Sequence, residues 1–199
     1  MRLTIRQKVL AIGIGALLPL LLTTLMSFRV LEEVDPKDST LIAATTAATN
    51  QMRADMMHDA LRGDIQAAML ASSEAEFAPI DSDVQKHTAT VRDMFVKNLR
   101  LSLGDAVAAE MRDLQARMQT YSGLVEDIVK TARVSKEQAT KLMPEFDRQF
   151  QDLEDRMGRF DDTLQVLVEQ AQAKEVSDVV SARTFMLVSG AIASLLLIV

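Results

Sequence analysis

The chain has 199 residues, a formal net charge of -6 and no cysteine. The absence of cysteine excludes a disulfide framework, thiol catalysis and a cysteine-ligated zinc site. A negative charge without a block of basic residues argues against nucleic-acid binding. Aromatic residues make up only 4% of the chain, and good helix formers such as alanine, leucine, methionine and glutamate dominate it. We therefore expect an all-α protein.

An apolar run without any charged side chain, VLAIGIGALLPLLLTTLMSF, occupies residues 9–28. A helix of this length, at about 1.5 Å per residue, covers the roughly 30 Å hydrocarbon core of a bilayer. The run is longer than the apolar core of a signal peptide, and Ser27-Phe28-Arg29 is not a small-residue cleavage site. We expect an uncleaved transmembrane helix at 9–28 after a short cytoplasmic tail at 1–8.

A second apolar run begins at Phe185 and reaches Val199. We expect residues 185–199 to be a second transmembrane helix, cut off before its end. Basic residues precede the first run and acidic residues follow it, so the positive-inside bias places the N-terminus in the cytoplasm. The sequence therefore predicts a two-pass membrane protein, with residues 29–184 forming a domain outside the cytoplasm.

The first two helices of this middle region are predicted from their apolar stripes and breakers. The first starts near Asp35-Pro36, ends near Ser73 and carries two apolar stripes. The wide stripe contains Leu41, Ala48, Met52, Met56, Ala60, Ala67 and Leu70, and the narrow one Met57, Leu61, Ile65 and Ala68. Two stripes need two packing partners, which we expect to be the protein's own core and a second copy. The second helix is predicted to start at Asp81 or Ser82, after Pro79, and to stop at Gly104.

The next two helices are predicted from apolar residues that follow one another at steps of four or three. The third carries Val107, Met111, Leu114, Met118, Tyr121, Val125, Ile128 and Ala132, and the fourth Leu142, Phe146, Phe150, Leu153, Met157, Phe160, Leu164, Leu167 and Ala171. This is the seam spacing of a helical bundle. Ser135–Gln138 offers a capping box for the fourth helix, in which Pro144 either causes a kink or marks the true first turn. We expect an antiparallel up-down-up-down four-helix bundle flanked by two transmembrane helices, the last bundle helix running on into the membrane.

This order of elements resembles the N-terminal half of a methyl-accepting chemotaxis receptor with a four-helix-bundle sensor domain. The segment NQMRADMMHDALRGDIQAAML, residues 50–70, is similar to the first sensor helix of one branch of that family. The resemblance implies a homodimer in the bacterial inner membrane whose domain at residues 29–184 is periplasmic. That domain would sense a small molecule, or a periplasmic binding protein, toward its membrane-distal end. The resemblance also implies a piston-like or rotational displacement of the last helix. Contacts with a kinase and a coupling protein would belong to a cytoplasmic part beyond residue 199.

Candidate ligand contacts follow from the chemistry of a small anionic ligand. Guanidinium groups bind carboxylates with two parallel hydrogen bonds, although an arginine on a long helix more often faces solvent. The candidates are Arg53, Arg62 and Arg148, with Asn50, His58 and Thr140 as neutral hydrogen-bonding groups. Asp55, His58, Asp59 and Arg62 share one helix face, where an exposed ladder of ion pairs is favoured over a metal site or a proton switch.

No phosphate-binding loop, metalloprotease motif or nucleophile elbow is present, and no motif requires a cofactor. We therefore expect no enzymatic activity, and the resemblance implies that the chain is the ligand-sensing half of a chemotaxis transducer. Two alternatives stay open. The same sensor could feed a membrane histidine kinase or a nucleotide cyclase, which only the sequence after Val199 would distinguish. A ligand-free anchoring or assembly bundle would show no change in melting with any metabolite.

Overall fold

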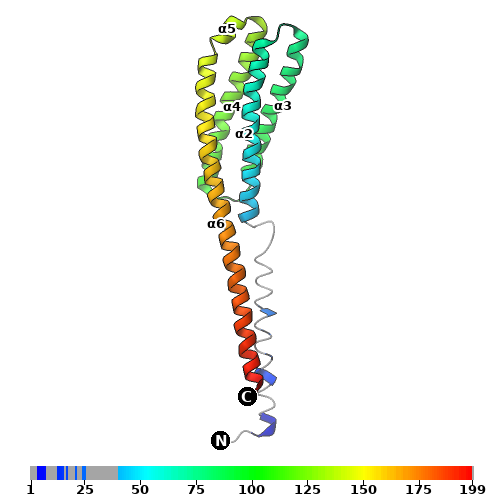
Figure 1. Ribbon diagram of the computed structural model, residues 1–199, viewed down its shortest axis with the longest axis vertical. Helices are drawn as coiled ribbons and strands as arrows, with labels where there is room; N and C mark the ends of the chain where they lie inside the picture. Colours follow the sequence, from blue (N-terminus) through cyan, green and yellow to red (C-terminus); the bar gives the residue numbers. More distant parts are fainter. Residues whose placement is uncertain are drawn as a thin grey trace. The chain divides into compact units, whose positions relative to one another are not determined.

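The computed structural model describes residues 4–7, 13–15, 17, 21, 24–25 and 40–198, with side chains placed as far as residue 192 in the last helix. Every regular element in residues 40–198 is an α-helix, so the expected all-α class is confirmed. The helices are α2 (Thr40–Leu70), α3 (Glu74–Asn98), α4 (Asp105–Val134), the short α5 (Lys136–Thr140) and α6 (Met143–Ile198) (Figure 1).

The chain divides into two compact units. Thr40–Glu169 forms the first, which we call the core unit, and Met1–Ser39 with Gln170–Val199 forms the second. In the second unit, most of the side chains described between residues 172 and 192 are exposed. The packed interior that can position functional groups therefore lies in the core unit.

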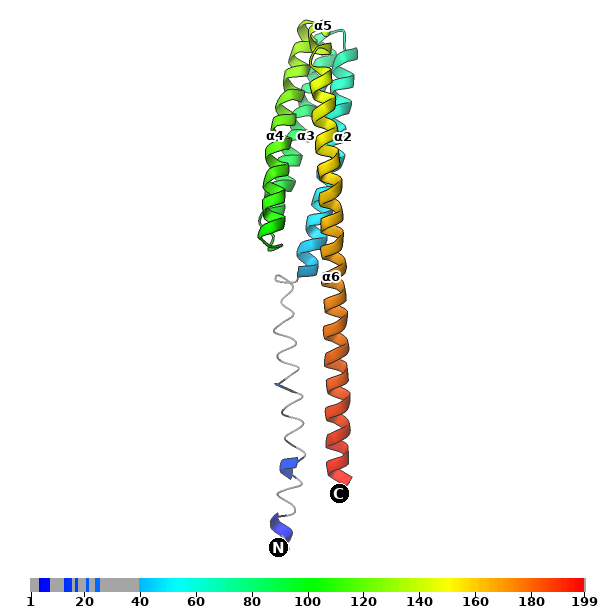
Figure 2. The ribbon, with the colours of Figure 1, turned by 90° about the vertical axis from the view of Figure 1, so that its left-hand side faces the viewer.

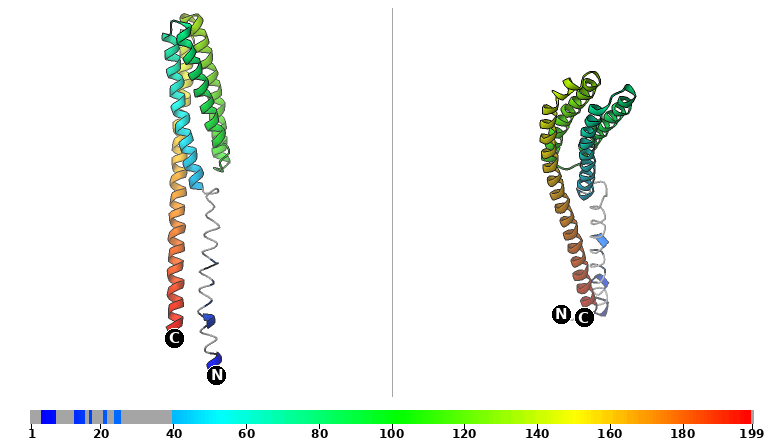
Figure 3. Two further views of the ribbon diagram at one scale, coloured as in Figure 1. Left: turned by 90° about the vertical axis from the view of Figure 1, so that its right-hand side faces the viewer. Right: turned by 45° about the horizontal axis from the view of Figure 1, so that its top comes forward.

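Four long helical segments share one hydrophobic core in the core unit. Helix α2 packs against α3 and α4, and α3 packs against α4, as the views from two sides show (Figures 2 and 3). The first part of α6 contributes its apolar seam to the same core. The largest fully buried side chains are Tyr121, Phe95, Phe146, Phe160, Leu61, Ile65, Met111, Leu114, Ile128, Leu153, Met157 and Leu164.

The heptad seams of α4 and α6 are where the sequence predicted them. All eight seam positions predicted for residues 107–132 are buried in α4. In α6, the predicted positions from Phe146 to Leu164 are buried as well, and so is Ala171. A regular apolar repeat forms one continuous surface on a helix, and such a repeat can be recognised in a single sequence.

Helix α2 turns its narrow apolar stripe toward the core. Leu61, Ile65 and Ala68 are fully buried, whereas Met52 and Met56 of the wide stripe are 65% and 61% exposed. The rest of the core-facing surface consists of small or polar residues: Ala44, Ala47, Gln51, Ala54, His58 and Asp64. Met52 and Met56 are thus left on the outside of this chain.

The predicted start of the second helix was wrong. Helix α3 begins at Glu74, so Pro79 lies inside it rather than ahead of it. Phe77 and Ile80, on either side of Pro79, are buried and hold this first part of the helix against the core. Ser73 occupies the N-cap position, and its carbonyl accepts hydrogen bonds from the amides of Glu76 and Phe77. The Ser73 side chain makes no capping hydrogen bond, so the S-x-x-E spacing of residues 73–76 does not form a capping box.

The fourth predicted helix is divided in two. The Ser135 side chain accepts a 3.3 Å hydrogen bond from the amide of Gln138, so the predicted cap forms. It caps only α5, however, because the chain turns at Lys141 and Leu142 before α6 begins at Met143. Pro144 is the second residue of α6 and therefore marks a first turn, where its missing N–H is tolerated.

Several predictions about the chain ends fall on residues that the structure does not describe. The predicted transmembrane helix at 9–28 and the helix start near Asp35 lie outside the described residues, apart from single positions and short stretches. In the part of the chain that the structure describes, no helix is both long and apolar enough to cross a membrane. Because the side chains after residue 192 belong to the undescribed part, the two predicted transmembrane helices stay predictions.

Replacing Pro79 with alanine should stabilise the protein. The exposed proline cannot donate the hydrogen bond that a residue inside α3 normally makes, and alanine can. An interior proline costs about 3 kcal/mol relative to alanine, and the greater entropy of the unfolded variant offsets part of the gain. We expect Pro79→Ala to raise the free energy of unfolding by about 1–2 kcal/mol. Thermal unfolding followed by circular dichroism measures this, and Ser82→Ala on the same helix is the control. A lower melting temperature for Pro79→Ala would contradict the assignment of residue 79 to a helix.

Candidate functional site

The six predicted ligand contacts do not converge on one place. Asn50 donates a 2.8 Å hydrogen bond from Nδ2 to Oδ1 of Asn98, which in turn donates to the Ala47 carbonyl. These bonds join α2 to α3 and leave Asn50 in a structural role. Arg53 is exposed and makes no ion pair or hydrogen bond with any residue that the structure describes.

Thr140 and Arg148 are engaged with their own helices. The Thr140 hydroxyl donates to the Lys136 carbonyl at 2.8 Å. The Arg148 guanidinium binds both carboxylate oxygens of Glu145, and this pairing, with Gln149, lowers the pKa of Glu145 to about 2. Both residues lie on exposed surfaces, so neither points into a cavity with the α2 candidates.

His58 and Arg62 are the two candidates that the structure brings together. The His58 ring stacks on Phe150 of α6, with centroids 4.2 Å apart and an interplanar angle of 14°. Tyr121 of α4 packs against His58 at 4.9 Å and donates a 3.3 Å hydrogen bond to the His58 carbonyl. The Arg62 guanidinium lies 4.6 Å from the centroid of the Phe150 ring, a cation–π distance. Three helices thus meet at one aromatic cluster, which we define as His58, Tyr121, Phe146 and Phe150.

The expectation that His58 belongs to an exposed ladder was wrong. His58 is only 1% exposed, and its Nε2 has no hydrogen-bond partner among the described residues. Burial in this aromatic surrounding lowers the pKa of His58 to about 4, because the charged imidazolium would lose its hydration; nearby Asp59 opposes the shift. The ring is therefore neutral at physiological pH. Its partners are aromatic faces because the heptad seams of α4 and α6 direct large rings toward α2.

The second histidine pairs with an acid elsewhere. His87 Nδ1 of α3 lies 2.7 Å from Asp64 Oδ2 of α2, and both side chains are largely buried. Burial raises the pKa of Asp64, and the hydrogen bond to His87 works against that shift. No cluster of three or more histidine or acidic side chains in the described residues is arranged to hold a metal ion. We infer that the His87–Asp64 pair is a polar contact that helps to hold α2 against α3.

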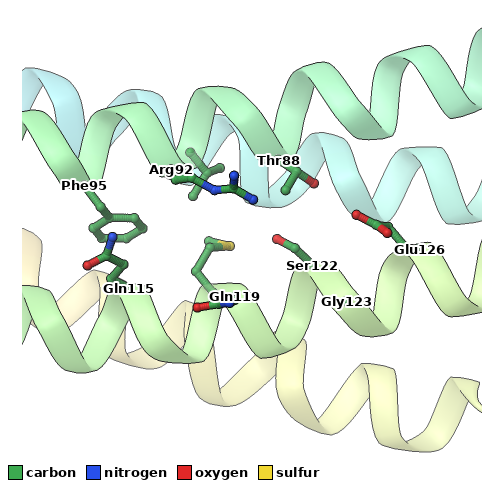
Figure 4. A pocket seen from close by; sticks show the side chains of 10 residues that line it. Thr88, Arg92, Phe95, Gln115, Gln119, Ser122, Gly123 and Glu126 are labelled. Carbon is green, nitrogen blue, oxygen red and sulfur yellow. The ribbon is translucent and has the colours of Figure 1, made fainter.

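A groove of about 550 Å³ lies between α3 and α4. Its lining residues are Thr88, Val91, Arg92 and Phe95 of α3, and Gln115, Met118, Gln119, Ser122, Gly123 and Glu126 of α4. Figure 4 shows Arg92 across from Gln119 and Thr88 across from Ser122, with Glu126 beyond them toward one end. The volume is within the range of small-molecule sites.

None of the groove residues was among the predicted ligand contacts. The sequence does contain two pairs of polar residues at a spacing of four that could have indicated the groove. They are Thr88 with Arg92 and Ser122 with Glu126. Such a spacing places each pair on one helix face. Only the packing of α3 against α4 shows that the two faces oppose each other, so the sequence alone could not have distinguished these pairs from ordinary surface residues.

The burial of His58 predicts a loss of stability in acid. Unfolded histidine has a pKa of 6.5 and folded His58 about 4, so the unfolded chain binds more protons between these values and stability falls as the pH falls through that window. The shift corresponds to about 3 kcal/mol, fully lost only below pH 4. Asp161, with a pKa raised to about 6 by burial and by Asp55 and Asp162, acts in the opposite direction.

Because His58 and Asp161 act in opposite directions, the prediction concerns how the pH dependence of stability differs between variants. Between pH 7 and 4, His58→Phe should lose about 3 kcal/mol less unfolding free energy than the unaltered chain. Tyr121→Phe, which keeps the ring but removes the hydroxyl, should retain the full loss. Denaturant unfolding at a series of pH values measures both. Identical pH profiles for His58→Phe and the unaltered chain would show that His58 is not held neutral by burial.

Comparison with known proteins supplies no relative. No family model, no curated protein and no solved structure matches this chain. A function must therefore be argued from the residues and the geometry described above.

Proposed function

We propose that the chain is the ligand-sensing, membrane-anchored half of a chemotaxis transducer. One observation carries the proposal: α6 is a single helix from Met143 to Ile198. It begins among the buried aromatic residues of the core unit and extends into the apolar run at 185–199. A continuous helix gives a displacement at Phe150 a direct covalent path toward a membrane segment, which is what a transducer of small movements needs.

The proposal includes an antiparallel up-down-up-down four-helix bundle. Its support is that α2, α3, α4 and α6 contribute to one core. The 71–73 connection and α5 also lie at one end of the core unit, with the 99–104 connection toward the other (Figure 1). Short connections of this kind favour antiparallel neighbours. The bundle would be periplasmic, between a first membrane helix at 9–28 and a second at 185–199.

The proposed partners follow from this placement. A small molecule, or a periplasmic binding protein, would act on the bundle, and a kinase with its coupling protein would be reached through a cytoplasmic region beyond residue 199. A second copy of the chain would cover the outer face of α2, where Met52 and Met56 are exposed. Exposed methionines at a spacing of four residues suit an adaptable helix–helix contact. No catalytic step and no cofactor is part of this proposal.

Cysteine labelling tests the proposed topology, and the absence of native cysteine leaves no background. Ser82 and Ser102 are exposed in the core unit, and Gln7 is exposed in the tail. In intact bacteria, a membrane-impermeant maleimide should label Ser82→Cys and Ser102→Cys strongly, and label Gln7→Cys only after permeabilisation. Protection of both core-unit cysteines in intact cells would place the helices in the cytoplasm and remove the transducer proposal.

Crosslinking tests the proposed homodimer. Under mild oxidation in membranes, Met52→Cys and Met56→Cys should each form a covalent dimer, because the twofold partner would bring the same faces together. Ala54→Cys is the buried control, and Val134→Cys, at an 87% exposed position, controls for random collision. Crosslinking at Val134→Cys equal to that at the two methionine positions would contradict a dimer built on the outer face of α2.

A further inference from the structure

We propose that the groove between α3 and α4 binds a short linear zwitterion. The ligand would carry a carboxylate at one end and an ammonium at the other, separated by more than the single carbon of an α-amino acid, as in a dipeptide or an ω-amino acid. This deepens the proposed function by naming a ligand class. It rests on that function only for the role of binding in signalling, since binding itself is a property of the groove.

The charged groups of the groove are available for such a ligand. Arg92 makes no ion pair with any residue that the structure describes. Among the described residues, Glu126 forms an ion pair only with Lys130, at 3.3 Å between exposed side chains one helical turn apart. Exposed pairs of that kind contribute little and are readily exchanged. The groove therefore offers a cation for a carboxylate and an acid for an ammonium group.

A hydroxyl between these charges lacks a hydrogen-bond partner. Thr88 Oγ1 is buried without one among the described residues. Thr90 and Thr120, on the same two helices, instead donate to the carbonyl four residues earlier, which is the usual arrangement in a helix. A buried hydroxyl without a partner is costly, so a ligand atom that bonds to it recovers that free energy. Ser122, across from Thr88 in Figure 4, is 4% exposed and presents a second hydroxyl.

The floor of the groove suits the middle of the ligand. Val91, Phe95 and Met118 are buried and form an apolar base. The amide side chains of Gln115 and Gln119 lie along the α4 side (Figure 4). Methylene groups can rest on the apolar base, and a peptide group can exchange hydrogen bonds with an amide.

The spacing of the charges indicates the ligand's length. Arg92 lies across from Gln119, its guanidinium points along the groove toward Thr88, and Glu126 lies beyond Thr88 (Figure 4). Gln119 and Glu126 are seven residues apart on α4, about 10 Å along the helix axis. The nitrogen and carboxyl carbon of an α-amino acid are only about 2.5 Å apart. Even with the Arg92 side chain reaching toward Thr88, a longer zwitterion matches both charges better.

Titration calorimetry on the full 199-residue chain in a non-ionic detergent tests the proposal. The probes are L-alanyl-L-alanine and 5-aminovalerate as linear zwitterions, with glycine, pentanoate and pentylamine as the short zwitterion and the two single charges. Charge-assisted hydrogen bonds are the strong ones, so each linear zwitterion should bind saturably with a Kd at least about tenfold below those of the three controls. Absence of saturable binding for both linear probes, or equally tight binding of pentanoate, would overturn the proposal.

Variants identify the groups responsible. Arg92→Gln and Glu126→Gln should each weaken binding of the linear probes about tenfold or more. Thr88→Val should weaken binding severalfold without lowering the melting temperature, because it removes a buried hydroxyl that has no partner in the free chain. Arg53→Gln, at an exposed position of α2, is the matched control and should bind the linear probes normally. An equal loss in Arg53→Gln, or full binding in Glu126→Gln, would overturn the assignment. Neither result bears on the cysteine-labelling test, so the groove and the transducer proposal can fail separately.

Discussion

The structure depends on how α2 packs against the large side chains of α4 and α6. Along its core-facing stripe α2 presents four alanines, at positions 44, 47, 54 and 68. The opposing seams supply Tyr121, Phe146, Phe150 and Phe160, all buried. Small residues on one helix leave room for rings on the others, which is one way in which a core is filled. The same arrangement explains why Met52 and Met56 are left outside.

The buried polar groups of this core differ in how fully they are hydrogen-bonded. Asn98 is buried but fully engaged with Asn50 and the Ala47 carbonyl. Gln51 is buried with neither atom of its amide hydrogen-bonded to a described residue, and His58 has an unpartnered Nε2. Each such group reduces stability, because its lost hydration is not replaced. The lowered pKa of His58 therefore makes the middle of α2 sensitive to acid.

The groove and α6 are linked by contacts. Ser122 in the groove is the neighbour of Tyr121, which bonds to the His58 carbonyl and packs against the His58 ring. His58 stacks on Phe150 of α6. A ligand that shifted α4 would thus also shift a member of the aromatic cluster. This contact route shows where coupling between the proposed site and α6 should be measured, and double-mutant cycles across it would give its size.

The sequence by itself determined the all-helical class, the seams of α4 and α6 and the cap at Ser135, because helix propensity and a four/three apolar repeat are local properties. It did not determine where α3 begins, since the buried contacts of Phe77 and Ile80 outweigh the local effect of Pro79. Nor did it determine which stripe of α2 faces inward, because two apolar stripes on one helix are equivalent until the shapes of the partner helices are known. The burial of His58 and the groove between α3 and α4 were decided only by the tertiary structure. Both depend on side chains from separate helices, and no local sequence pattern encodes how those helices are positioned relative to one another.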